Sequence, residues 1–149
     1  MQANFIFSSG ELDTGDGLVL APGLAVAADA IKANWKPLDA RNGWNSFAIS
    51  ELMIWRHSFA VTARFHPDRL ALIDCLWKDG SIRKQDWSAT EEDLLQEKKT
   101  LVRLIMKEAQ TTPAATSLGV DTFAFNWGTL SVRADPRSMM VMLTIAYSM

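Results

Sequence analysis

The sequence predicts a single α+β domain over residues 1–149: an antiparallel sheet of five or more strands with one long helix (about 89–109) packed across one face, and a shorter N-terminal helix. Three observations predict this fold. The C-terminal segment alternates apolar and polar side chains on both sides of an Asp135-Pro136 turn, which is the periodicity of strands. Residues 46–77 are rich in β-branched and aromatic side chains, which favour strands. Residues 89–109 carry an apolar stripe at helical spacing.

The N-terminal third predicts a short hairpin and then a short helix. Phe5-Ile-Phe7 and Leu18-Val-Leu20 flank a segment rich in Gly and Asp, as in a hairpin. Pro22-Gly23 precedes apolar residues at helical spacing, and Pro37 limits their continuation. The helix expected between them is rich in Ala, which lets it approach a neighbouring sheet closely.

Residues 46–77 predict three antiparallel strands with turns at Arg56-His-Ser58 and at His66-Pro-Asp-Arg69. Apolar residues at alternate positions from Phe59 to Phe65 mark the core face of the middle strand. Asp74 interrupts the apolar residues of the third strand. It is expected either to face solvent at a strand edge or to pair with Arg64 or Arg69 across the hairpin.

The long helix has the best-marked start in the chain. Ser88-Ala-Thr-Glu91 has the pattern of a capping box, in which the Ser hydroxyl and the Glu carboxylate satisfy free N–H groups. Acidic residues follow it, where the helix dipole favours negative charge. About twenty residues give a helix of about 30 Å, long enough to lie across the sheet.

The last strand, near residues 139–147, has apolar side chains on both faces. Val141, Leu143 and Ile145 mark its core face, while Met140 and Met142 stand where a half-exposed strand carries charges. We therefore expect something to cover this second face. Two covers remain open: the Ala-rich first helix, or a partner or second copy of the chain, because Met adapts to irregular surfaces.

Composition limits the classes of function. The formal net charge is −2 and the Lys and Arg residues are scattered among Asp and Glu, so the chain lacks the basic footprint of a nucleic-acid-binding protein. Cys75 is the single cysteine, which excludes an intrachain disulfide and favours a reducing compartment. The sequence has no secretory signal pattern and no apolar run long enough to span a membrane. These features predict a cytoplasmic protein without membrane or nucleic-acid partners.

No catalytic, metal or cofactor site is predicted. His57 and His66 are the only histidines, and both fall at expected strand ends or turns without a recognisable nucleophile nearby. Asp13 and Asp16 lie in a Gly-rich turn that lacks the spacing of a calcium loop. Cys75, within an apolar strand, is expected to behave as a small hydrophobic residue.

Six tryptophans exceed what a core of this size typically needs, and Trp is enriched where proteins recognise each other. Trp35, Trp44 and Trp55 are the ones expected to be exposed. Trp44 lies in the polar segment Arg41-Asn-Gly-Trp-Asn45, where it either anchors a partner or folds back to cap the sheet. The predicted partner-binding residues are therefore Trp35, Trp44, Trp55, Met140, Met142, Asp13 and Asp16.

Three sequence strings also resemble those of a loosely defined group of small, uncharacterised bacterial proteins. The strings are Phe65-His-Pro-Asp-Arg-Leu70, Trp87-Ser-Ala-Thr-Glu-Glu-Asp-Leu94, and Phe125-Asn-Trp-Gly128 followed by Asp135-Pro-Arg137 and Ile145-Ala-Tyr147. Some members of that group are similar to immunity proteins that lie near secreted toxins. The resemblance implies an α+β domain and a protein partner, and it implies no catalytic activity.

Taken together, these features predict a non-catalytic protein-binding module, and the resemblance implies an immunity-type protein that occludes a partner toxin. Two alternatives stay open. The first is a small-molecule-binding protein or enzyme with a pocket between the sheet and the first helix that uses His57, His66 or Asp74. The second is a homo-oligomeric structural component that associates through Met140 and Met142.

Overall fold

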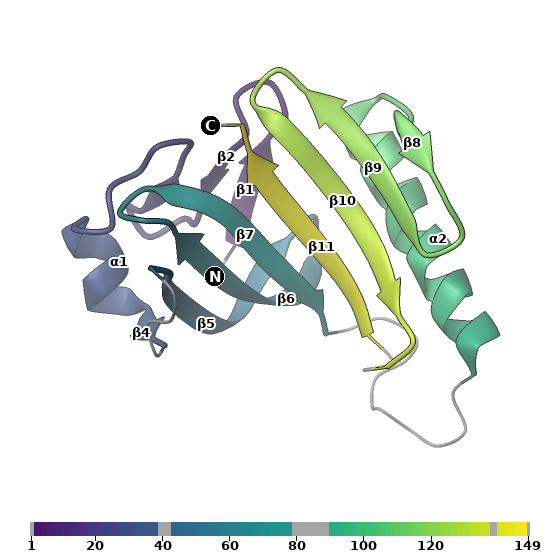
Figure 1. Ribbon diagram of the computed structural model, residues 1–149, viewed down its shortest axis with the longest axis horizontal. Coiled ribbons are helices and arrows are strands. Elements are labelled where there is room, and N and C mark those ends of the chain that lie inside the picture. Colours follow the sequence, from purple (N-terminus) through teal and green to yellow (C-terminus); the bar gives the residue numbers. More distant parts are fainter. Residues whose placement is uncertain (1, 39–42, 79–89, 138–139, 149) are drawn as a thin grey trace.

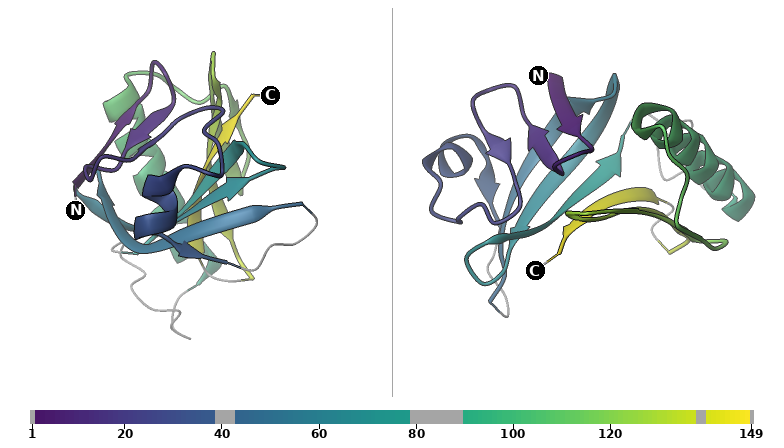
Figure 2. Two further views of the ribbon diagram at one scale, coloured as in Figure 1. Left: turned by 90° about the vertical axis from the view of Figure 1, so that its left-hand side faces the viewer. Right: turned by 90° about the horizontal axis from the view of Figure 1, so that it is seen from above.

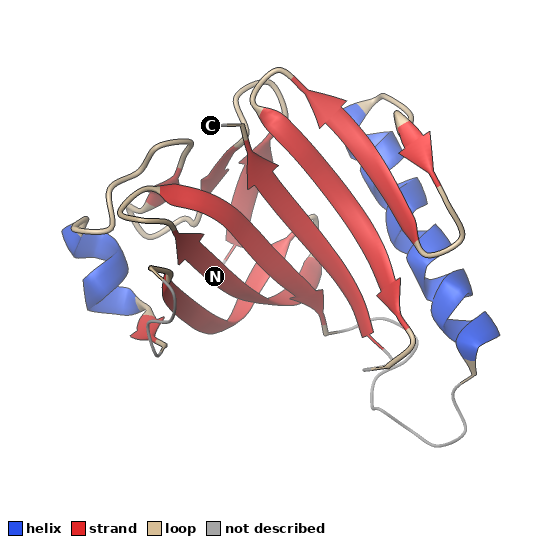
Figure 3. Ribbon diagram, viewed as in Figure 1, coloured by secondary structure: helices blue, strands red, loops and turns tan. Residues whose placement is uncertain are grey.

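The computed structural model describes residues 2–38, 43–78, 90–137 and 140–148. These residues form one large sheet and two helices (Figures 1 and 3). The strands are β1 (Gln2–Ile6), β2 (Glu11–Asp13), β3 (Val19–Leu20), β4 (Lys36–Pro37), β5 (Asn45–Ile54), β6 (His57–Phe65), β7 (Leu70–Trp77), β8 (Ala115–Thr116), β9 (Val120–Phe125), β10 (Gly128–Asp135) and β11 (Met140–Tyr147). The helices are α1 (Asp29–Asn34) and α2 (Glu91–Ala109).

The predicted fold class is wrong. The described chain is mostly sheet, with eleven strands, and the sheet is mixed because β1 runs parallel to β5. α2 is the one long helix, and the expected N-terminal helix is reduced to the six residues of α1. The segment before α1 instead pairs with the β6–β7 turn: the Val26 N–H donates to the Asp68 carbonyl at 2.7 Å, and the Leu70 N–H to the Leu24 carbonyl at 2.8 Å. This pairing satisfies backbone groups that a marginal short helix would otherwise satisfy.

The sheet order is β3-β2-β1-β5-β6-β7-β11-β10-β9-β8, with β4 also paired to β5. The predicted antiparallel run of three strands is confirmed as β5, β6 and β7. Its first turn lies at Trp55 and Arg56, whose φ angles of 52° and 67° are both positive, as the two-residue turn of a twisted hairpin requires. The C-terminal segment forms three strands and not two, because Asn126 and Trp127 make an additional turn between β9 and β10.

α2 covers one end of the inner face of the sheet. Thr90 is its N-cap, and the Asp93 N–H donates to Thr90 Oγ1 at 3.1 Å while Asp93 Oδ2 accepts from the Thr90 N–H at 3.0 Å. The capping box is thus formed by Thr90 and Asp93; Ser88, which the sequence predicted as the cap, lies outside the described residues. Buried side chains along α2, from Leu94 to Ile105, face the sheet. The N-terminal strands lie on the same side of β10 and β11 as α2 (Figure 2).

An aromatic seam joins the N-terminal strands to the C-terminal hairpin. The indoles of Trp55 and Trp127 stack on Phe7 and Phe125, with ring centroids 5.9 and 5.0 Å apart respectively. Trp127 Nε1 donates to the Phe7 carbonyl at 2.6 Å, and the Tyr147 hydroxyl donates to the Gly10 carbonyl at 2.6 Å. Trp127 therefore closes the core against the N-terminal turn. The seam fixes the curvature that brings β1 and β11, far apart in sequence, together.

Two buried acidic groups make the fold sensitive to alkaline pH. Burial, with the Asp74 charge as a smaller cause, raises the pKa of the Cys75 thiol above its ordinary 9.0. Burial also raises the pKa of the Tyr147 hydroxyl above its ordinary 10.0, with smaller contributions from Cys75 and Glu11. Both groups ionise in the unfolded chain at a pH where they stay protonated in the folded chain. The stability that they contribute is therefore fully present below about pH 9 and is lost as pH rises, by about 1.4 kcal/mol per pH unit for each ionised group.

We expect urea unfolding between pH 8 and 11 to show this loss, and Tyr147→Phe and Cys75→Ala to make it shallower. The comparison is clean because the chain has one tyrosine and one cysteine. Equal pH slopes for the original protein and both variants would contradict the assignment.

Candidate functional site

One face of the sheet is not covered by any described element. α2 and the N-terminal strands lie on the opposite side of β10 and β11 (Figure 2). The uncovered side of β6, β7, β11, β10 and β9 is termed the open face. Strand register aligns a polar row across all five strands on this face. The row consists of Thr62, Asp74, Thr144, Ser131 and Thr122.

Asp74 is the centre of a hydrogen-bond network on the open face. Its Oδ2 accepts from Arg64 Nε at 2.7 Å, and its Oδ1 accepts from Thr144 Oγ1 at 2.8 Å. Arg64 also donates from Nη1 to Ser46 Oγ at 3.4 Å. Of the alternatives expected for Asp74, the structure has the cross-strand pair with Arg64. Because both side chains are partly in solvent, we expect about 1 kcal/mol or less of stability from the pair; its main effect is to hold both groups in one geometry.

The network forms the floor of a shallow hollow of about 440 Å³. The hollow is lined by Trp44, Arg64, Leu72, Asp74, Arg133 and Thr144. The half-buried indole of Trp44 stands at one end, tilted on the His66 ring with centroids 4.7 Å apart. Arg133, on β10, is exposed. An aromatic group, fixed polar groups and an exposed guanidinium around a shallow depression are typical of a surface that contacts another protein.

The three tryptophans expected to be exposed have different environments. Trp44 lines the hollow on the open face. Trp35 is only 3% exposed, so the prediction that it is a surface residue is wrong. Trp55 is half-buried and packs in the aromatic seam. Its indole ring packs β1 against β5 and β6. Composition does not reveal this contact, because the segments are distant in sequence.

The methionine and aspartate candidates lie in different parts of the molecule. Met142 lies half-buried on the open face, opposite Leu76 on β7 and Arg133 on β10. α1 packs against β5 and does not cover this face, so the first of the two predicted covers is wrong. Asp13 and Asp16 stabilise their own turn: Asp13 Oδ1 accepts from the Gly15 N–H at 3.0 Å, and Asp16 Oδ1 accepts from Thr14 Oγ1 and from the Leu18 N–H.

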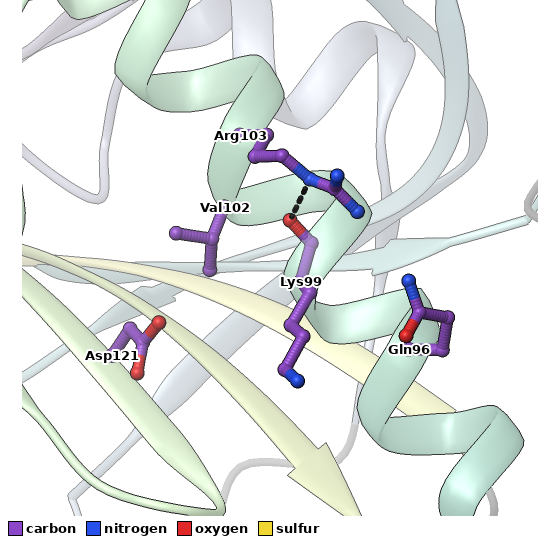
Figure 4. A pocket seen from close by; sticks show the side chains of 5 residues that line it. All are labelled: Gln96, Lys99, Val102, Arg103 and Asp121. Carbon is purple, nitrogen blue, oxygen red and sulfur yellow. Dashed lines mark hydrogen bonds between the residues drawn. The ribbon is translucent and has the colours of Figure 1, made fainter.

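Two further hollows lie on the described surface, and the first of them is lined in part by Thr62 of the open face. One, of about 430 Å³, lies between the end of α1 and strands β5 and β6, and neither histidine nor Asp74 lines it. The other, of about 470 Å³, lies between α2 and β9 (Figure 4). In it, Arg103 Nε donates to the Lys99 carbonyl at 3.4 Å, and Asp121 on β9 pairs with Lys98 at 3.0 Å. Neither hollow combines an aromatic side chain with a fixed polar network.

The groups considered for catalysis have separate contacts. His57 packs edge-on against Trp77, with ring centroids 5.5 Å apart, whereas His66 contacts Trp44. Asp74 has both carboxylate oxygens in the Arg64–Thr144 network. Among the described residues, no three His, Cys, Asp or Glu side chains are placed to hold a metal ion. None of the described helices is both long and apolar enough to cross a membrane.

Comparison with known proteins gives a likeness at the level of fold. No family model matches the sequence, and no curated protein matches it. A solved structure does, with a TM-score of 0.55, over 97% of this chain and 86% of the other. It is described as "Rhs1-CT in complex with cognate immunity protein RhsI1". The structural neighbour is thus a complex that contains an immunity protein. The two sequences are 12% identical, so the likeness concerns the fold.

Of the residues on or beside the open face, the sequence analysis singled out Trp44, Met142 and Asp74, and it did not single out Arg133, Thr144 or Ser131. The alternation of the last two strands places Thr144 beside Met142, and Ser131 beside Arg133, on one face. That signal was present in the sequence. Recognising the row of polar groups also required the pairing of β7 with β11, which joins segments about seventy residues apart and leaves no local pattern.

Proposed function

We propose that this chain is a non-catalytic protein-binding module of the immunity type, which binds a partner toxin through the open face. The observation that carries the proposal is the hollow on that face, with Trp44 and Leu72 beside a fixed Arg64–Asp74–Thr144 network. A rigid polar floor lowers the entropy cost of forming an interface. An indole beside it supplies the kind of anchor that dominates binding energies.

The fold likeness to a structure that contains a cognate immunity protein supports the same proposal. Binding by occlusion requires a large accessible surface and no reactive centre. Five neighbouring strands contribute to the open face, which gives a broad platform for a partner. We further propose that the protein acts in the cytoplasm, where its buried single cysteine stays a thiol.

Site-specific photo-cross-linking in the native host tests the proposal. We expect a benzophenone amino acid at Leu72, on the open face, to yield an adduct with one protein that is toxic when produced alone. Coexpression of this chain is expected to suppress that toxicity, and Leu72→Glu to weaken suppression, because a charge at the hollow is desolvated on binding. The matched control is the same label at Thr100, on the exposed side of α2.

The absence of a toxin adduct at Leu72 would contradict the proposal, and so would two other results. One is an adduct of equal yield from Thr100. The other is an adduct at Leu72 only between two copies of this chain, which would instead favour self-association through the Leu76–Met142 part of the face.

A further inference from the structure

We infer that Arg133 is a specificity-determining residue of the open face, and that it pairs with an Asp or Glu carboxylate on a protein segment that occupies the hollow. The assignment of the hollow to a protein partner rests on the proposed function. The chemistry of that partner follows from the charges around the hollow.

The first step is the balance of charge in the hollow. Among the described residues, its lining contains three charged side chains: Arg64, Asp74 and Arg133. Asp74 accepts one hydrogen bond on each oxygen, from Arg64 and from Thr144, so the Arg64 and Asp74 charges compensate each other. Within the described part of the chain, Arg133 forms no ion pair. The described lining therefore presents one uncompensated positive charge, that of Arg133.

The second step is the surroundings of Arg133. In the sheet register it lies between Met142 on β11 and Val120 on β9, so its nearest cross-strand neighbours are apolar. Asp135 follows on the same face, and its Oδ1 accepts the Arg137 N–H at 3.0 Å. A partner that covers Met142 also removes water from the guanidinium. Its charge then requires an anionic partner, because an unpaired charge is costly to bury.

The third step is the kind of anion. A guanidinium offers donors in a planar fork that matches a carboxylate with two parallel hydrogen bonds. A nucleic-acid backbone requires several cations along its path, whereas one uncompensated cation lines this hollow. From Arg133 on β10 to Arg64 on β6 the face crosses three strand spacings, or about 14 Å. That span fits a short loop or extended segment with one acidic residue, and apolar residues placed toward Leu72 and Trp44.

The test uses a phage-displayed library of random dodecapeptides, selected on the immobilised full chain. Peptides that bind the original protein but not a Leu72→Glu variant occupy the hollow. We expect these peptides to share an Asp or Glu beside apolar residues. We expect Arg133→Gln to weaken one such peptide at least tenfold and Arg133→Lys to weaken it less, since the charge remains but the fork is lost. Arg103→Gln, on the exposed side of α2, is the matched control.

A double-mutant cycle completes the test. Replacing the peptide's acidic residue by its amide and applying Arg133→Gln should together cost little more than either change alone, because both remove the same ion pair. Additive losses, the absence of acidic residues from the selected peptides, or a selection that gives no hollow-binding peptide would each overturn the inference. Coupling in the cycle without a toxin adduct at Leu72 would leave this inference standing and remove the proposed function.

Discussion

Replacing Gly128 by alanine is expected to prevent the protein from folding. Gly128 has a φ of +149°, and a Cβ added there would lie 2.0 Å from the Ala146 carbonyl oxygen. Gly128 pairs with both Phe125 on β9 and Tyr147 on β11, so the colliding atom belongs to a strand held on both sides. Relief requires β10 and β11 to separate at the end where Tyr147 and Trp127 close the aromatic seam. We expect a loss of at least about 4 kcal/mol, comparable with the whole stability of many domains.

The measurement is urea unfolding followed by tryptophan fluorescence, with the soluble yield as a second readout. Gly17→Ala is the matched control: its φ of +96° is also positive, but a Cβ there meets nothing within 4 Å. This control is expected to lose stability through backbone strain alone, by about 1–3 kcal/mol. If both variants lost the same stability, the close approach of Gly128 to β11 would not be the cause.

Local patterns predicted the elements whose signals are local. Alternation from Phe59 to Phe65 gave the correct buried face of β6, and acidic residues after a hydroxyl residue marked the start of α2 within a few positions. In each case the decisive neighbours lie within one strand, turn or helix start.

The prediction of the fold class was wrong where the decisive contacts join segments that are distant in sequence. β1 pairs with β5 through Gln2 and Met53, and no turn residue announces a parallel pair. Residues 24–26 have the composition of a helix, but they pair with the β6–β7 turn. Tertiary pairing overrides propensity at such places, because a short helix gains little stability by itself.

The candidate site follows the same division. Asp74 was unusual in an apolar strand. The sequence left open solvent exposure at a strand edge or a pair with Arg64 or Arg69, and the structure has the pair with Arg64. Thr144 completes the network from β11, and Arg133 enters the hollow from β10. Those positions became neighbours only through the order β6-β7-β11-β10. In the same order, α1 does not cover the part of the open face around Met142. The partner hypothesis therefore concerns the open face.

The second large effect is expected at the ion pair that ties α2 to the sheet. Lys98 Nζ lies 3.0 Å from Asp121 Oδ1 on β9, and the two side chains are only 5% and 12% exposed. Nζ also donates to the Ser117 carbonyl at 3.5 Å. Lys98→Met keeps most of the length of the side chain but leaves the Asp121 carboxylate buried without its cation. We expect a loss of about 3–5 kcal/mol, because desolvation of the remaining charge is no longer offset.

A set of variants separates this cause from a general weakening of α2. Lys99→Met changes the exposed neighbour and is expected to alter stability by about 0.5 kcal/mol or less. Asp121→Leu alone leaves the ammonium unpaired and should be as damaging as Lys98→Met. The double variant Lys98→Met with Asp121→Leu removes both charges and replaces them with apolar volume, so it should be more stable than either single variant. Urea unfolding of the five proteins measures this order. A double variant as unstable as the sum of its parts would show that packing of α2 on β9, and not the unpaired charge, sets the cost.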